Sequence, residues 1–289
     1  MIYKMTYKGR PAYQVTAARL TAVFLPEDGG KMASLKYGNR ELLAQAEGER
    51  YQRLLPDGDY VSSECSAFDD MFPTIDPYTP DQGLFAGITY PDHGEVCRYP
   101  HQVEIGADSL TFSFASRLFP VNFSNSIHVN GDGGLAVNYT IRNNGAEPFP
   151  YIWAAHCMIQ AEPDAVIVCP YTSVAPVKSM FGKLLSRNSM QSFTRGGESY
   201  KFYYEEPIPE GWCGYRYGDG KTLMLRYPAE IIKFLGIWIN NGSFKGMYNI
   251  ALEPCTAPYD RPDQADAAGY GSVIQPGETV CFQLTMDME

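Results

Sequence analysis

Histidine and carboxylate side chains are the residues of this sequence best suited to acid–base chemistry, because together they can donate and accept protons at neutral pH. The chain has four histidines among 289 residues. His156 lies in the apolar stretch 151–159, where strand alternation would place it on one face with Ile152 and Met158. Cys157 would point to the opposite face, so we expect no Cys–His pair. His156 is therefore either an acid–base group or a core histidine bonded to a backbone carbonyl.

Glu253 is the carboxylate with the most suggestive setting. In segment 248–254 an extended chain would place Asn249, Ala251 and Glu253 on one face. Pro254 cannot donate a hydrogen bond to a neighbouring strand, so we expect the strand to end there, at the rim of a cavity. Burying a carboxylate without partners is costly. Glu253 is thus either a general base or one half of a surface salt bridge.

Three further ionisable residues lie at turn signals. His93 lies in Pro-Asp-His-Gly-Glu, residues 91–95, where proline and glycine predict a turn. Asp69 and Asp70 form a pair of acids among apolar and aromatic residues, shortly before a proline. All three are candidates for binding a ligand. The simpler interpretations are a solvated turn for His93 and an Asx turn for the aspartates.

Trp238 and Asn240 would share one face of a strand, and this combination suits a sugar site. A flat indole ring covers the apolar C–H face of a pyranose, while a nearby amide bonds its hydroxyl groups. The alternative for Trp238 is a place in the hydrophobic core.

The charge balance and the missing motifs exclude several classes of function. The chain has 23 basic and 33 acidic residues, a net charge of −10 and a pI near 4.9, which argues against nucleic acid as a partner. No Gly-rich phosphate loop, dinucleotide fingerprint, hydrolase nucleophile elbow or H-E-x-x-H zinc motif occurs.

Sequence features of secretion, metal binding and membrane insertion are also missing. No signal peptide is visible, and no window approaches about 18 consecutive apolar residues. Seven scattered cysteines without a C-x-x-C pair argue against structural zinc and against a secreted disulfide framework. We expect a cytoplasmic protein that binds no metal and has no membrane partner.

Alternation of apolar and polar residues dominates the chain and predicts β-strands. The clearest runs lie at 109–114, 135–141, 222–227 and 280–286. Helical turns are expected at 41–46 and 265–268, and the polar stretch 180–210 is expected to run over the surface. The pattern predicts an all-β protein in which two antiparallel sheets pack in one domain, residues 1–289.

Several segments form an ordered set along the whole chain. They are 24–35 with 41–43, Phe-Asp-Asp-Met-Phe-Pro-Thr at 68–74, Pro-Asp-His-Gly-Glu at 91–95, Trp-Ala-Ala-His at 153–156, Asn-Ile-Ala-Leu-Glu-Pro at 249–254 and Pro-Gly-Glu at 276–278. This set resembles the galactose mutarotase (aldose 1-epimerase) superfamily. The resemblance implies an antiparallel β supersandwich with a concave sugar site.

The resemblance also implies roles for individual residues. Glu253 matches the family's base, His156 its acid, and His93 a second histidine that contacts the sugar. The implied reaction interconverts the α and β anomers of an aldohexose by acid–base ring opening, without a cofactor, in a monomer or homodimer. This chain departs from the family at the Asn-Arg motif, where segment 68–73 has acids instead, so the substrate-binding arginine has no assigned counterpart.

Three alternatives remain open at this point. A non-catalytic carbohydrate-binding or regulatory module on the same fold would keep Trp238 and the polar rim without needing Glu253. A hexose-phosphate mutarotase would need a basic pocket, which neither the net charge nor any Arg/Lys cluster favours. A glycoside hydrolase or lyase would need a second carboxylate about 5–10 Å from Glu253, for which Asp69 and Asp70 are the candidates.

Overall fold

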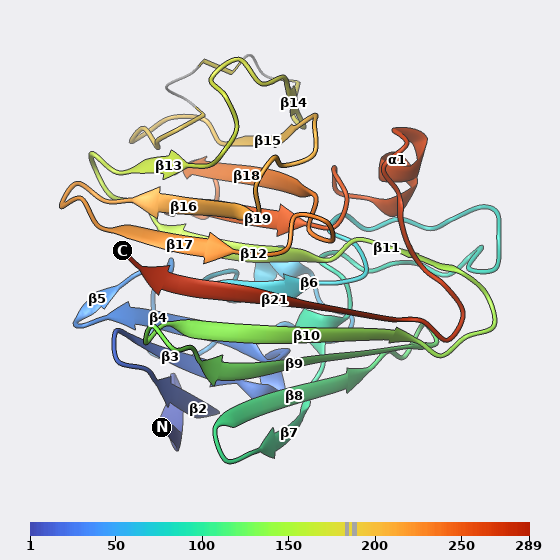
Figure 1. Ribbon diagram of the computed structural model, residues 1–289, viewed down its shortest axis with the longest axis horizontal. Helices are drawn as coiled ribbons and strands as arrows, with labels where there is room; N and C mark the ends of the chain where they lie inside the picture. The colour runs from blue at the N-terminus through green and yellow to red at the C-terminus, as the bar shows by residue number, and fades with distance from the viewer. Residues whose placement is uncertain (183–184, 187–189) are drawn as a thin grey trace.

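Two large antiparallel sheets lie one behind the other in a computed structural model of the chain (Figure 1), which describes residues 1–182, 185–186 and 190–289. Within these residues the first sheet has eleven strands in the order β1-β2-β3-β4-β6-β12-β19-β18-β15-β14, with β5 paired to β4. Its strands are β1 (Ile2–Tyr7), β2 (Arg10–Thr16), β3 (Leu20–Leu25), β4 (Lys31–Tyr37), β5 (Arg40–Glu41), β6 (Phe68–Met71), β12 (Ala154–Gln160), β14 (Val177–Ser179), β15 (Tyr200–Tyr204), β18 (Phe234–Asn241) and β19 (Tyr248–Cys255).

The second sheet has eight strands within the same residues, in the order β13-β16-β17-β21-β10-β9-β8-β7. They are β7 (Gln102–Ile105), β8 (Ser109–Ala115), β9 (Val121–Val129), β10 (Leu135–Asn143), β13 (Val166–Val168), β16 (Trp212–Arg216), β17 (Thr222–Arg226) and β21 (Thr279–Met288). The remaining elements are the small pair β11 (Phe149–Tyr151) and β20 (Ser272–Ile274), the helix α1 (Pro262–Ala267) and the 3₁₀ turns η1 (Pro26–Asp28), η2 (Tyr60–Ser62) and η3 (Val96–Arg98).

The expected antiparallel β supersandwich is confirmed, and so are the four strands that alternation predicted most clearly, which are β8, β10, β17 and β21. The helical turn expected at 265–268 falls on α1. The turn expected at 41–46 is wrong, because this segment is extended and bonds to β12 and to β4. None of the helices in the described ranges is long and apolar enough to cross a membrane.

The surface excursion expected at 180–210 is wrong at Tyr200–Tyr204. Residues 183–184 and 187–189 of that stretch lie outside the described residues. Strand β15, however, pairs with β18 inside the first sheet, and its residues 201–204 are buried. Four of its five residues are aromatic and favour a strand, but the polar composition of the surrounding segment obscured this short run.

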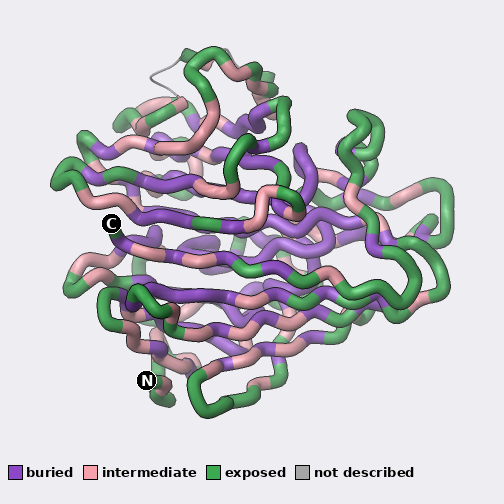
Figure 2. The backbone as a smooth tube through the Cα atoms, in the orientation of Figure 1, coloured by how far each residue is buried: buried purple, intermediate pink, exposed green. Residues whose placement is uncertain are grey.

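Strands β12 and β19, in the middle of the first sheet, are buried on both faces (Figure 2). On one face Ala155, Cys157 and Ile159 join the core between the two sheets. The other face carries Ala154, His156 and Met158, as strand alternation predicted, and is covered by loops rather than by the second sheet. This loop-covered face is where polar side chains can be held away from bulk water.

Asp70 on β6 lies in the core between the sheets. Its Oδ1 accepts a hydrogen bond from Trp153 Nε1 at 3.2 Å, and its Oδ2 accepts one from Asn125 Nδ2 at 2.9 Å. Burial raises the pKa of Asp70 to about 7, although these bonds and one with Tyr139 oppose the shift. The folded protein therefore binds a proton at this carboxyl over a pH range in which the unfolded chain, with an aspartate pKa of about 3.9, does not.

We expect the free energy of unfolding to fall as the pH rises from about 4 through 7. Below this range the bound proton stabilises the folded protein, and this stabilisation is lost as the carboxyl of the folded protein loses its proton. Asp70→Asn should remove this contribution and so become more stable relative to the wild type as the pH increases. Urea unfolding of both proteins at a series of pH values measures the difference.

The exposed Asp81 supplies the matched control. Asp81→Asn should shift stability by a similar small amount at every pH. A difference between Asp70→Asn and the wild type that stays constant from pH 5 to pH 8 would contradict a buried carboxyl that titrates near neutrality.

Candidate active site

One row of side chains crosses the loop-covered face of the first sheet. The strand register places Tyr203 of β15 opposite Gly236 of β18, and Gly236 opposite Glu253 of β19. On the next strands, His156 of β12 lies opposite Asp69 of β6. The same row therefore contains both residues predicted to exchange protons, because strand alternation gives them the same face and the sheet brings their strands together.

Two members of this row, His156 and Glu253, line a cavity of about 340 Å³. The polar residues around the cavity include His93, His156, Lys201, Asn249, Glu253 and Asp260. Its apolar residues include Met158, Met180, Phe181, Trp238, Phe244 and Met247. A concave site with a few convergent polar groups and an apolar wall is typical of small-molecule sites.

Glu253 is fully buried and its two oxygens have different surroundings. Oε2 accepts a short hydrogen bond from Lys201 Nζ. Oε1 has no hydrogen-bond partner among the described residues, and it lies 4.0 Å from His156 Nε2. Burial raises the pKa of Glu253 above its usual value, while the charge of Lys201 opposes that shift. Oε2 is thus bonded to Lys201, while Oε1 has a free hydrogen-bonding position for a ligand.

Lys201 is the cation of the site, and sequence reasoning missed it. Besides Glu253, its Nζ lies 3.5 Å from Asp260 Oδ1, which also accepts a hydrogen bond from Tyr203 at 2.8 Å. Burial opposes the charged form of Lys201, but Asp260 and Glu253 outweigh it and raise its pKa above the usual value. The lysine therefore stays protonated between the two carboxylates.

Gly236 makes this ion pair possible, because it lies on β18 between the strands that carry the two partners. A Cβ atom at this position would lie 2.7 Å from the Tyr203 ring and 3.3 Å from Glu253 Oε2. The first distance is shorter than real side chains allow. Glycine is needed here so that the Tyr203 ring and Glu253 can lie close to the backbone of β18.

His156 is held from behind by a chain of three side chains. Its Nδ1 lies 3.2 Å from the hydroxyl of Tyr60, which donates to Asp69 Oδ2 at 2.8 Å. Lys31 Nζ donates to the same oxygen at 2.6 Å. When the tyrosine proton points to Asp69, the tyrosine oxygen accepts the Nδ1–H of His156, and Nε2 is left facing the cavity. Burial, assisted by the charges of His93 and Lys201, lowers the pKa of His156 well below its usual value.

His93 lies at the turn that its sequence predicted. It has a positive φ of 58°, and its Nδ1 bonds Asp92 Oδ1 at 2.8 Å. Its ring stacks on Tyr60 with centroids 3.5 Å apart and meets the His156 ring edge-on at 5.3 Å. The following Gly94 is required, because a Cβ there would lie 2.1 Å from the carbonyl oxygen of Phe72. The turn thus packs the His93 ring against Tyr60, the residue that orients His156.

The remaining predicted residues are distributed differently. Trp238 lines the cavity, whereas Asp69 lies behind Tyr60 and Asp70 lies in the core between the sheets. Asn240 is buried next to the cavity and bonds Asn249, which does line it. Arg98 is the nearest arginine in the sequence to His93, but it does not line the cavity and cannot replace the family's substrate-binding arginine there. Its guanidinium donates to backbone carbonyl oxygens.

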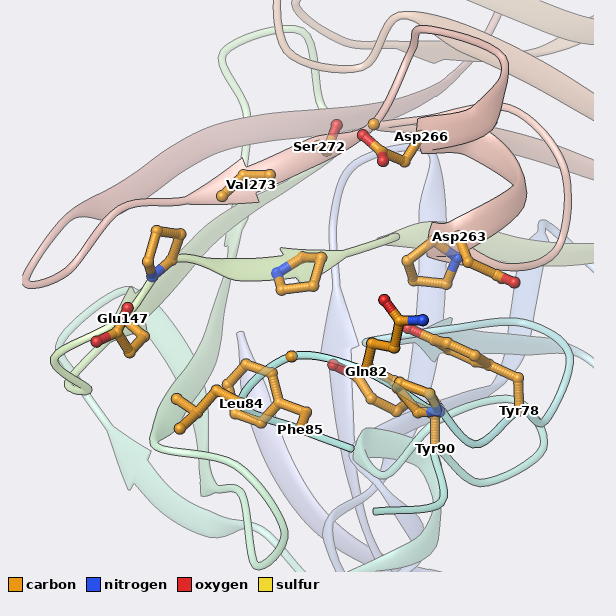
Figure 3. A pocket seen from close by; sticks show the side chains of 16 residues that line it. Tyr78, Gln82, Leu84, Phe85, Tyr90, Glu147, Asp263, Asp266, Ser272 and Val273 are labelled. Carbon is orange, nitrogen blue, oxygen red and sulfur yellow. The ribbon is translucent and has the colours of Figure 1, made fainter. Parts of the chain in front are cut away.

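A second cavity, of about 370 Å³, lies between α1, β20, β11 and the loop 78–90 (Figure 3). Its lining combines aromatic rings such as Tyr78 and Phe85 with prolines and with the carboxylates Asp263 and Asp266. No histidine or lysine is found among the described residues that line it. In the described part of the chain, no three His, Cys, Asp or Glu side chains are grouped as a metal site requires. Glu253 and His156, the residues predicted to exchange protons, line the first cavity.

Comparison with solved structures identifies the fold. A candidate aldose 1-epimerase from Klebsiella pneumoniae superposes with a TM-score of 0.76 at 15% identity, over 98% of this chain and 81% of that one. A candidate aldose 1-epimerase from Escherichia coli K12 has a TM-score of 0.67 at 15% identity, over 100% and 99%. A galactose mutarotase-like protein from Lactobacillus casei has a TM-score of 0.66 at 16% identity, over 96% and 100%. The chain has the galactose mutarotase-like fold.

At the level of sequence this likeness is weak. No protein-family model matches the chain, and no curated protein matches it significantly. The galactose mutarotase-like architecture expected from the ordered segments is confirmed across the whole chain.

Lys201→Met should raise the pKa of Glu253 further, because it removes the cation that stabilises the charged carboxylate. Infrared difference spectroscopy should then show a protonated-carboxyl band at neutral pH. The double variant Lys201→Met/Glu253→Gln should lack that band, which assigns it to Glu253.

Lys201→Arg is the matched control, because it keeps a positive charge next to the carboxylate. It should show much less of the band than Lys201→Met. If Lys201→Met leaves the carboxyl region of the spectrum unchanged, Lys201 is not the group that controls the charge of Glu253.

Proposed function

We propose that the protein is an aldose 1-epimerase that interconverts the α and β anomers of an unphosphorylated aldose. The observation that carries this proposal is the pair formed by Glu253 Oε1 and His156 Nε2, which lie 4.0 Å apart in one cavity, with Oε1 unbonded to any described residue. The anomeric hydroxyl and the ring oxygen of a pyranose are both attached to C1. Two groups this close together can therefore contact both oxygens.

The reaction moves two protons and breaks one bond. The reactive state has an ionised Glu253 and a His156 protonated at both ring nitrogens. From it, Glu253 Oε1 takes the proton of the anomeric hydroxyl while His156 Nε2 gives its proton to the ring oxygen, and the C1–O5 bond breaks to leave the open-chain aldehyde, a protonated Glu253 and a neutral His156. Rotation about the C1–C2 bond presents the other face of the carbonyl. Reclosure reverses both proton transfers and gives the other anomer, so each group serves as acid in one direction and as base in the other.

The pKa shifts of the pair favour this exchange. Burial raises the pKa of Glu253 and lowers that of His156, so the two values move toward each other. A carboxylate with a raised pKa takes up a proton more readily, and an imidazolium with a lowered pKa releases one more readily, so both shifts favour the two proton transfers of ring opening.

Tyr60 and Lys201 act as positioning residues in this mechanism. Tyr60 accepts the Nδ1–H of His156, so the imidazole that has lost its Nε2 proton remains in the tautomer able to take it back. Lys201 occupies Glu253 Oε2, so proton exchange is confined to Oε1. His93 lines the same cavity and is available to bond a sugar hydroxyl.

A glycoside hydrolase on this fold would use a different pair. The other carboxylates that line the cavity are Asp76 and Asp260, not the sequence candidates Asp69 and Asp70. Asp76 is exposed, and Asp260 shares Lys201 with Glu253. Asp260 Oδ1 is occupied by Tyr203 and Lys201. This leaves acid–base exchange with His156 as the function that the site supports better, and hydrolysis as an outcome to assay.

We expect Glu253→Gln to slow anomer exchange by about 10²–10⁴-fold, because loss of a positioned general base typically costs that much. The glutamine keeps the side-chain size and can still bond a sugar hydroxyl, so sugar affinity should change much less. Polarimetry or NMR exchange spectroscopy on glucose and galactose, corrected for the spontaneous rate, measures the reaction.

His156→Asn should also slow exchange, and the double variant should lose less than the product of the single losses, because the pair works as a unit. A wild-type protein that binds sugars yet accelerates no anomer exchange over a panel of aldoses would favour a carbohydrate-binding module. Release of free sugar from glycosides would favour the hydrolase.

The charge of the cavity predicts discrimination against sugar phosphates. Three carboxylates, Asp76, Glu253 and Asp260, face one lysine among the described residues that line it. Calorimetric titration should therefore show weaker binding of a hexose 6-phosphate than of the hexose. The difference should shrink at high ionic strength, because salt screens charge repulsion.

Asp76→Asn is the informative variant for this prediction, because it removes one negative charge outside the Glu253–Lys201 pair. It should reduce the difference in affinity between the hexose and its 6-phosphate. Tighter binding of the phosphate by the wild-type protein would instead point to a hexose-phosphate mutarotase.

A further inference from the structure

Asn249 lies in the same cavity as Glu253, on the same face of the same strand. The two residues are four positions apart on β19, which places their Cα atoms about 14 Å apart at roughly 3.4 Å per residue. A single pyranose ring is much shorter than this. A sugar that contacts Glu253 with its anomeric hydroxyl therefore leaves Asn249 uncovered.

The orientation of the Asn249 amide is determined by its neighbours. Asn240 Oδ1 accepts the backbone N–H groups of Gly242 and Phe244, each at 3.2 Å. Asn240 Nδ2 is consequently the donor, and it bonds Asn249 Oδ1 at 3.1 Å. Because backbone donors fix the first amide, the second amide must present its NH₂ group on the remaining side.

Asn249 Nδ2 has no hydrogen-bond partner within the described ranges, although the residue is only 1% exposed. A buried donor without a partner is costly, and such groups in folded proteins usually have a functional explanation. Since Asn249 lines the cavity, a ligand oxygen is the partner that would satisfy it. Among the described residues, the cavity lining therefore has an unpaired acceptor at Glu253 and an unpaired donor four residues away.

An apolar row separates these two polar ends. The strand register places Trp238 of β18 opposite Ala251 of β19, and Ala251 opposite Met158 of β12. Phe181 and Phe244 pack edge-on against the indole of Trp238, with ring centroids at 5.7 and 6.2 Å. Aromatic and thioether side chains suit the C–H face of a sugar ring.

We propose, resting on the epimerase function above, that the substrate is a reducing disaccharide. Its reducing ring lies against Glu253 and His156, the apolar row contacts the C–H faces, and an oxygen of the second ring accepts the Nδ2–H of Asn249. An entirely apolar substituent on a single sugar would cover Trp238 but would leave the Asn249 donor unpaired. Met158 and Met247 line the path between the two ends, and their flexible side chains can repack around the second ring.

The test compares monosaccharides with disaccharides. Anomer exchange is measured for glucose, galactose, maltose, cellobiose and lactose, each corrected for its spontaneous rate. At least one disaccharide should have a kcat/KM about tenfold or more above its monosaccharide, as one hydrogen bond and one stacking contact provide.

Asn249→Leu removes the donor at similar volume and should lower the ratio of disaccharide to glucose kcat/KM by about three- to tenfold. Trp238→Leu should lower the same ratio, because it removes the aromatic ring of the apolar row. This second variant tests the proposal if Asn249→Leu fails to fold. Asn144→Leu, an exposed asparagine on another loop, is the matched control and should leave the ratio unchanged.

Binding supplies a readout independent of turnover. In the Glu253→Gln background, calorimetry should show tighter binding of the preferred disaccharide than of glucose, and Asn249→Leu should remove most of that preference. A monosaccharide preference, or equal losses for both ligands in Asn249→Leu, overturns the inference and leaves the epimerase function intact. Absence of Glu253-dependent exchange with every sugar overturns the epimerase function itself.

Discussion

The buried ion pair between Lys201 and Glu253 is the interaction on which the site depends. A carboxylate that is fully buried in the middle of a sheet is unfavourable unless a charged partner bonds it. That partner comes from β15, two strands away, and reaches across β18 where Gly236 has no side chain. Three strands must therefore be in register before Glu253 can carry a charge, and only with Oε2 occupied is Oε1 left alone with His156.

The two faces of the first sheet have separate functions because strand residues alternate. Asp69 and Asp70 are adjacent in β6, yet Asp70 titrates in the core between the sheets while Asp69 holds the hydroxyl of Tyr60 behind the cavity. The second sheet packs on one face of the first sheet and buries the main hydrophobic core there. The other face is covered by turns that bring Tyr60 and His93 over the strands, and both residues line the cavity.

Much of the architecture could be predicted because it depends on local patterns. Period-2 runs identified strands such as β8 and β10, and alternation placed His156 with Met158 and Glu253 with Asn249. Prediction failed where a short strand lies in a polar segment, as β15 does. Its lysine belongs to the polar composition that predicts a surface segment. Tyr60 lies in a short 3₁₀ turn with no period at all, so no sequence signal connected it with His156.

The sequence by itself determined the strands, the face to which each of their side chains points, and which residues could exchange protons. Only the tertiary structure decided which of these residues meet. Lys201 and Glu253 are 52 residues apart, and Tyr60 and His156 are 96 apart. Alternation leaves the order and the register of strands undetermined, and a shift of one position would turn every side chain of a strand to the opposite face. Long-range pairing, driven by burial of the core, selects the one register that brings these groups together.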